Sequence, residues 1–293
     1  MNARTIFYAP GGTLRAPWRI GGFVVVYLAA KYALFGVARG LPTPGGFIPN
    51  MTEAWLLLLA SVIIASVVML RNVDRREWST IGLGARQAKP STLTLGLLVG
   101  GLGILIPSGA LIATHWLRVV PSSVEGSSVR FGLGTVAMFL PQSLSEELLS
   151  RGYAFAALRE AIGPLWTIAL SSVVFGLQHM MNPGADARTV TVVVLAGVWL
   201  GSIVVLTGSV YAAWMAHFAW NAGMVSVMHA PVSGIVFPAP NYITVGAGPT
   251  WATGGAWGPE ASAFAVIAMF VSIYAVYAWT RTRGVAAPEL ARG

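Results

Sequence analysis

The chain contains no cysteine among its 293 residues, and only 10% of them are charged. The absence of cysteine excludes disulfide bonds, thiolate-bound zinc and thiol nucleophiles. The scarcity of charge excludes an ordinary soluble protein, in which roughly 25% of residues are charged. Polar segments long enough to build a separate soluble core are also absent, so we expect a single domain over residues 1–293.

Apolar residues make up 56% of the chain, and the mean hydropathy is +0.71. Runs of about 18–25 apolar residues are long enough to cross a bilayer as helices. We count eight of them and predict an all-α, polytopic membrane bundle with a buried polar site. The runs cover residues 18–37, 53–71, 92–116, 131–158, 164–181, 189–207, 209–229 and 260–280.

The net charge of +8 is spread between these runs and is not gathered into a basic stripe, so we expect no nucleic-acid partner. With a cytoplasmic N-terminus, twelve Lys and Arg residues fall on the inner side and four on the outer side. This asymmetry predicts that both termini are cytoplasmic. The richness in Gly, Ala and Arg favours a bacterial source, and therefore the inner membrane.

One connection, residues 230–259, is rich in Gly and Pro and contains no Lys or Arg. The predicted topology places it on the outer side. A connection of this length is usually functional or disordered. Two interpretations stay open: a lid at the outer mouth, with Trp251 and Trp257 at the bilayer interface, or a flexible outer connection.

Residues 143–151 read SLSEELLSR and place three charges inside an apolar run. Each charge at the centre of a membrane helix costs about 2.5–3.5 kcal/mol on insertion scales. Glu147 and Arg151 are four residues apart and can neutralise each other on one helix face. Glu146 points about 100° away from Glu147, which leaves it free to face another surface.

Two later runs each add a polar pair with a spacing of four. Phe175 precedes His179, and His217 precedes Asn221, so each pair lies on one helix face. A carboxylate together with His179 can activate a water molecule. His217 and Asn221 can donate hydrogen bonds to an oxyanion. Phe175 is interpreted as a packing residue that shapes the pocket.

The same residues resemble three sequence motifs of the CPBP family, the CAAX protease and bacteriocin-processing (ABI) intramembrane proteases. Residues 146–151 resemble its EExxxR motif, residues 175–179 its FxxxH motif and residues 217–221 its HxxxN motif. The three motifs occur in the expected order, and the resemblance covers about residues 131–225. It implies a catalytic core in this part of the chain.

The resemblance also implies roles for individual residues. Glu146 and His179 would activate water, and His217 with Asn221 would form the oxyanion hole. The supporting residues would be Glu147, Arg151 and Phe175. The substrate would be a membrane-embedded or membrane-anchored protein or peptide in the lipid bilayer. Neither its prenylation nor the oligomeric state follows from the sequence.

A zinc enzyme is an alternative, because Glu146, His179 and His217 can form a zinc triad with an open position. Against it, the chain has no H-E-x-x-H pair on one helix, and each histidine lies on a different run. We therefore favour a glutamate-type mechanism without a cofactor, and zinc stays open.

Two alternatives are not proteases. Intramembrane Glu and His residues also form proton relays in transporters, although carriers commonly show inverted repeats and we find none here. A catalytically idle scaffold or immunity factor would use the Glu–Arg pair and Asn221 only to join helices. Such a protein would tolerate Glu146→Gln, whereas the protease would lose its activity.

Overall fold

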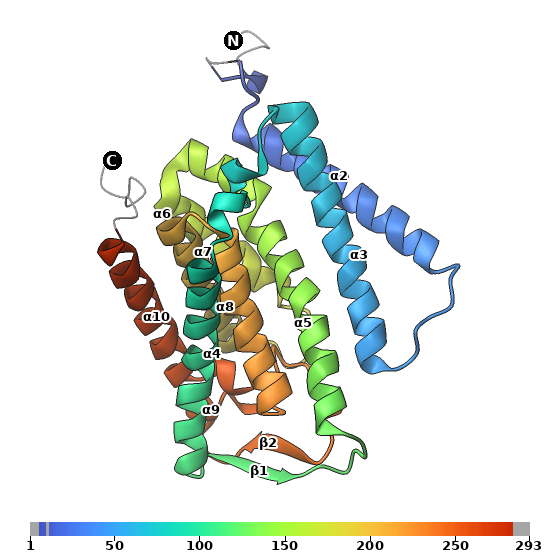
Figure 1. The fold of residues 1–293 in the computed structure, drawn as a ribbon, viewed down its shortest axis with the longest axis vertical. Helices are drawn as coiled ribbons and strands as arrows, with labels where there is room; N and C mark the ends of the chain where they lie inside the picture. Colours follow the sequence, from blue (N-terminus) through green and yellow to red (C-terminus); the bar gives the residue numbers. More distant parts are fainter. Residues whose placement is uncertain (1–5, 10–11, 284–293) are drawn as a thin grey trace.

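A computed structural model describes residues 6–9 and 12–283 of the chain, and these residues form a helical bundle (Figure 1). The α-helices are α2 (Ala16–Ala38), α3 (Phe47–Val68), α4 (Pro90–Ala113), α5 (Ser128–Arg151), α6 (Tyr153–Gln178), α7 (Ala187–Thr207), α8 (Val210–Ala222), α9 (Thr250–Thr253) and α10 (Ala263–Thr282). Two short antiparallel strands, β1 (Leu117–Pro121) and β2 (Tyr242–Gly246), pair at one end. The predicted all-α membrane bundle is confirmed.

Among the described residues, six helical stretches are long and apolar enough to cross a membrane. One of them, Ser128–Gln178, contains both α5 and α6, and α8 is not among the six. The predicted number of eight crossings is therefore not confirmed. The start of α2 and the end of α10 lie at the same end of the bundle (Figure 1). Which end faces the cytoplasm stays a prediction, and Arg4 and Arg292, which support it, lie outside the described residues.

The interval between the fourth and fifth predicted runs, 131–158 and 164–181, coincides with a kink in α6, where Gly163 has a φ of 77° and is followed by Pro164. A second break lies where none was predicted, because α5 ends before Gly152 and α6 begins directly after it. Hydropathy does not detect the turn at Gly152, because the residues around it are as apolar as a helix interior.

The short helix α8 lies inside the bundle, in contact with α4, α5 and α7. Two glycines of α4 allow a very close approach: a Cβ atom at Gly96 would lie 2.3 Å from the Ala212 carbonyl oxygen, and one at Gly100 would lie 2.0 Å from that of Ala216. Small residues four apart permit this kind of packing between membrane helices. The contact fixes α8, and with it His217, against the rest of the bundle.

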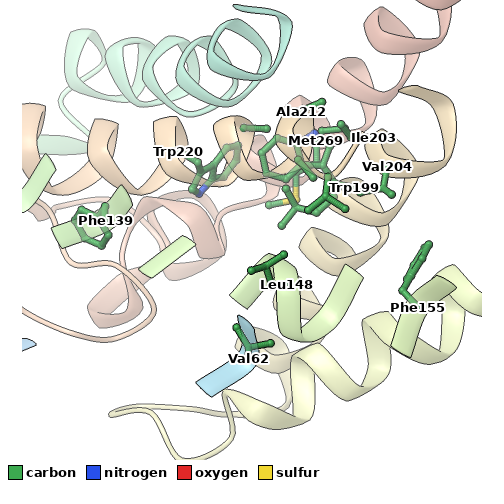
Figure 2. Close-up of a cluster of buried hydrophobic side chains, with 14 of the residues drawn as sticks. Val62, Phe139, Leu148, Phe155, Trp199, Ile203, Val204, Ala212, Trp220 and Met269 are labelled. Atoms are coloured by element: carbon green, nitrogen blue, oxygen red, sulfur yellow. The ribbon is translucent and has the colours of Figure 1, made fainter. Parts of the chain in front are cut away.

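Buried apolar side chains from several helices surround α8 (Figure 2). Trp199 and Ile203 of α7 lie close to Trp220 of α8 and Leu148 of α5 in this core. The helix α7 is the most buried candidate span, and α2 is the least buried. Four polar residues of the motifs, Glu147, Arg151, His217 and Asn221, are therefore buried, whereas Glu146 and His179 are partly exposed.

The outer connection is ordered, and we call residues 230–262 the cap. It contains β2, α9 and two short 3-10 helices, Gly255–Trp257 and Pro259–Ala261. Arg188 of α7 donates hydrogen bonds to its backbone carbonyls, including that of Ala261 at 2.8 Å. Trp257 is buried, so its predicted place at the bilayer interface is wrong, whereas Trp251 is exposed. The interpretation as a structureless connection is also wrong, because backbone pairing and Arg188 bind this segment to the bundle.

Candidate active site

The charges of the first motif are paired as their spacing predicts. Arg151 and Glu147 form an ion pair at 3.1 Å, and both side chains are fully buried. Arg151 also donates to the Gly197 carbonyl of α7 at 3.2 Å and lies 4.2 Å from the centroid of the Phe175 ring. The ion pair offsets the cost of burying two charges. Arg151 therefore joins α5 to α6 and α7 behind the site.

Glu146 is oriented differently, and its side chain keeps 18% of its exposure. Its Oε1 accepts a hydrogen bond from Gln142 Nε2 at 2.6 Å, and its Oε2 has no hydrogen-bond partner. The amide oxygen of Gln142 accepts a hydrogen bond from Asn221 Nδ2 at 3.1 Å. Gln142 thus connects the first motif to the third. We did not predict it, although it lies one helical turn before Glu146 and its spacing of four was visible.

His217 lies between the two glutamates. Its Nδ1 is 2.9 Å from Glu147 Oε1, and its Nε2 is 3.7 Å from Glu146 Oε2. Because a carboxylate accepts, Nδ1 carries the proton in the shorter contact. Glu147 therefore does more than neutralise Arg151, since it also fixes the orientation of the His217 ring.

His179 follows the last residue of α6. Its Nδ1 lies 2.8 Å from the Phe175 carbonyl oxygen, which can only accept, so Nδ1 carries a proton and Nε2 is the free acceptor. The Phe175 ring lies 4.8 Å from the His179 ring and 6.2 Å from the His217 ring, as expected for a residue that shapes the pocket. Within the described residues, no hydrogen bond or ion pair joins His179 to Glu146.

One small cavity brings residues of the second and third motifs together. It has a volume of about 40 Å³, and one water molecule occupies about 30 Å³ in the liquid. Its walls include Phe175, His179, His217, Asn221, Ser233 and Glu260. Three of the four predicted catalytic residues therefore line the same cavity. Glu146 lies beside it, behind the ring of His217.

Glu260 is a carboxylate that the sequence analysis missed. It is buried, and its Oε1 accepts hydrogen bonds from the Ser233 backbone N–H at 2.5 Å and the Ser233 hydroxyl at 3.0 Å. Burial raises the pKa of Glu260, and the two donors of Ser233 oppose this effect. The only signal in the sequence is that Glu260 is the single acidic residue of the cap.

The zinc alternative requires Glu146, His179 and His217 to converge on one point. In the part of the chain that the structure describes, no group of three or more His, Asp or Glu side chains is arranged to hold a metal ion. Glu146 Oε2 and His217 Nε2 lie 3.7 Å apart, whereas within the described residues no hydrogen bond or ion pair joins His179 to either of them. The three side chains do not fit a common ion as they are placed, and we derive no step through a metal.

A comparison with known families identifies the central part of the chain. The model of the Rce1-like family, described as type II CAAX prenyl endopeptidase, matches residues 128–223, and this stretch contains all three motifs. Residues 128–223 are thus similar to the Rce1-like family. The resemblance to CPBP proteases is thereby confirmed, although the match covers only about a third of the chain. No curated protein matches the sequence.

The Rce1-like stretch ends before the cap. Ser233, Trp257 and Glu260 line the cavity from outside it, so the family match assigns no role to them. Tyr153 lies inside it and directly follows the first motif, but its hydroxyl is bonded to Asp74 and Arg19 and not to the cavity. Position along the chain is therefore a poor guide to which side chains reach the site.

Proposed function

We propose that this protein is an intramembrane endopeptidase that hydrolyses a peptide bond of a membrane-embedded or membrane-anchored protein or peptide. One observation carries the proposal: His179 at the end of α6 and His217 and Asn221 of α8 line one cavity that is large enough to hold a water molecule. The Glu146 carboxylate lies 3.7 Å from the His217 ring beside it. The Rce1-like match supports a CAAX-type intramembrane protease.

In the proposed reaction, Glu146 and His179 activate a water molecule. The water oxygen forms a bond to the scissile carbonyl carbon, and one proton of the water passes to the base. The carbonyl oxygen becomes an oxyanion. The proton then passes to the leaving nitrogen as the C–N bond breaks, so that one peptide bond and one water yield a carboxylate and an amine.

The oxyanion is stabilised by His217 and Asn221. The amide nitrogen of Asn221 has two hydrogens, of which one is bonded to Gln142 and the other is available. The ring of His217 lies between two carboxylates, an arrangement that stabilises positive charge on it. A charged imidazole donates from both nitrogens, so Nε2 can donate to the oxyanion while Nδ1 remains bonded to Glu147.

The experiment is a comparison of membrane proteomes from cells that carry wild type or Glu146→Ala. We expect one or more uncleaved membrane precursors to accumulate in the variant. Glu125→Ala is a matched control, because Glu125 is exposed and distant from the motifs in the sequence. Identical proteomes, or full function of Glu146→Gln, would instead support an idle scaffold or an immunity factor.

A second measurement addresses zinc. We expect the purified protein to keep its activity after exhaustive chelation, because the proposed base is a carboxylate–imidazole pair. Stoichiometric zinc that is lost together with activity in His179→Ala would overturn the glutamate-type mechanism.

We also propose that the protein resides in a bacterial inner membrane with both termini cytoplasmic, as the distribution of Lys and Arg predicts.

A further inference from the structure

The cap is bound to the turn that carries His179. Asn182 in this turn donates its backbone N–H to the His179 carbonyl at 3.1 Å and its side-chain amide to the Ser233 carbonyl at 3.0 Å. At the next residue of the cap, Gly234, a Cβ atom would lie 2.1 Å from the Pro183 carbonyl oxygen. The two backbones therefore approach so closely that only glycine fits. Ser233 is held in place at the edge of the cavity.

Ser233 in turn holds Glu260. Both of its donors, the backbone N–H and the hydroxyl, are bonded to Glu260 Oε1. The Glu260 carboxyl also receives the side-chain donor of Trp220 and attracts His179 electrostatically. Of the residues that line the cavity, the ionisable ones are His179, His217 and Glu260. Because His217 is bonded to Glu147, the carboxylate that accompanies His179 is Glu260.

We propose that Glu260 is the charge partner of His179, a positioning residue that holds the cavity-facing imidazole ready to take the proton of the attacking water. The proposal rests on the proposed hydrolytic function and adds a residue from outside the Rce1-like stretch. His179 Nδ1–H is fixed by the Phe175 carbonyl, so Nε2 is the nitrogen that accepts the proton. The same Nε2–H later passes to the leaving nitrogen as the C–N bond breaks.

The chemistry requires such a partner. When Nε2 accepts a proton, the ring becomes a cation in a cavity walled by aromatic and aliphatic side chains. A neutral carbonyl at Nδ1 offsets this charge only weakly, whereas a carboxylate offsets it fully. Burial raises the pKa of Glu260, and the donors of Ser233 and Trp220 oppose this effect by favouring the ionised form. The sole acidic residue of the cap thus lies where positive charge develops.

The competing explanation is structural: Glu260 holds the cap closed through Ser233 and does nothing else. The two explanations differ in how Glu260 depends on His179. If Glu260 acts through His179, then Glu260→Gln has no further effect once His179 has been replaced by Gln. If Glu260 only maintains the fold, the two changes add, as independent sites do.

The first arm of the test needs no substrate. The full-length chain in lipid nanodiscs is labelled with ¹⁵N-histidine, and its four histidines are assigned by single His→Gln variants. We expect Glu260→Gln to shift the ring resonances of His179 and to leave those of His115 in place, with Glu260→Asp intermediate. Unchanged His179 resonances in Glu260→Gln would overturn the pairing. Glu125→Gln serves as the matched control.

The second arm is kinetic and uses the precursor that accumulates in Glu146→Ala membranes. We expect Glu260→Gln to lower kcat by about 10–100-fold with little change in KM, as for other residues that orient a catalytic group. The double variant with His179→Gln should be no slower than His179→Gln alone. Additive losses would overturn the proposal, and Ser233→Ala, which keeps the carboxylate, should have the smaller effect.

The two arms separate this proposal from the proposed function. A shift of the His179 resonances in a protein that cleaves nothing would retain the pairing and refute the protease. Normal turnover in Glu260→Gln together with unshifted resonances would refute the pairing and retain the protease.

Discussion

Two groups of buried charges in the described part of the chain differ in how completely they are bonded. The first, the Arg19 network, joins Arg19 of α2 to Asp74, Tyr153 and Glu160. Tyr153 in turn donates its hydroxyl to Asp74 at 2.8 Å. Arg19 has three partners, and its side chain is only 6% exposed. This group joins α2 to α6 and to the π-helical turn Met69–Asp74 that follows α3.

The second group, the site cluster, consists of Glu146, Glu147, Arg151 and His217. In contrast to the Arg19 network, this cluster contains three buried polar atoms without a hydrogen-bond partner: Glu146 Oε2, Glu147 Oε2 and Arg151 Nε. Buried polar atoms are nearly always bonded in native proteins, and exceptions need an explanation. The comparison indicates that the Arg19 network, whose charges are fully paired, maintains the fold. The site cluster instead keeps carboxylate oxygens available for a reaction.

The largest effect that would test this comparison is a loss of activity. We expect Glu146→Gln to lower kcat by about 10²–10⁴-fold, the usual contribution of general acid–base catalysis, because a Gln side chain cannot help His179 to activate the water. The thermal midpoint should hardly change, because a Gln side chain can still accept the bond from Gln142. Turnover of the accumulated precursor and a melting curve in nanodiscs measure the two quantities, with Glu125→Gln as the control. If the thermal midpoint of Glu146→Gln fell enough for unfolding to account for the loss of activity, the role of Glu146 would be structural.

The opposite pattern is expected in the Arg19 network. Arg19→Met leaves Asp74 buried without its cation, and loss of one partner of a buried pair costs about 3–5 kcal/mol. We expect a clear fall in the thermal midpoint, with normal kcat for the molecules that remain folded. Arg39→Met is the matched control, because Arg39 is exposed at the other end of the same helix. A kcat that falls while the midpoint is unchanged would reverse the assignment of the two groups.

What the sequence predicts well is local. The i, i+4 pair of Glu147 and Arg151 needs only helix geometry, and the three motifs need only their spacing. The contact between Gln142 and Glu146 is local too, because Gln142 lies one turn before Glu146 on the same helix, and their spacing could have predicted it. Hydropathy predicted a helical membrane bundle, but the predicted number of eight crossings is not confirmed, and a backbone turn at Gly152 divides one apolar run.

What the sequence does not predict depends on folding at long range. Glu260 lines the same cavity as His179 only because the cap folds back over the site through Ser233 and Asn182. Arg19 was counted as a topology signal at the membrane surface, but the fold turns it inward to Asp74. In both cases the partner lies far away in the chain, and no periodicity encodes the contact.

A smaller effect should follow from removing a single hydroxyl of the Arg19 network. Tyr153→Phe keeps the ring, which stacks on Phe23 at 5.5 Å, and deletes the donor to Asp74. Leaving one buried group unsatisfied costs about 1–3 kcal/mol, less than removing Arg19. The melting curve should show this intermediate loss, with the exposed Tyr274→Phe as the control. A kcat defect without a melting defect would place Tyr153 at the site after all.

The smallest effect is expected at the exposed edge of the network. The Glu160 side chain is 44% exposed and is shared between Arg19 and Arg76. Exposed ion pairs contribute about 0.2–1 kcal/mol and are screened by salt. We expect Glu160→Gln to lower the thermal midpoint slightly in low salt and hardly at all in high salt, with kcat unchanged. A large fall in the thermal midpoint that does not depend on salt would contradict this expectation. It would mean that Glu160 stabilises Arg19 as strongly as the buried Asp74 does.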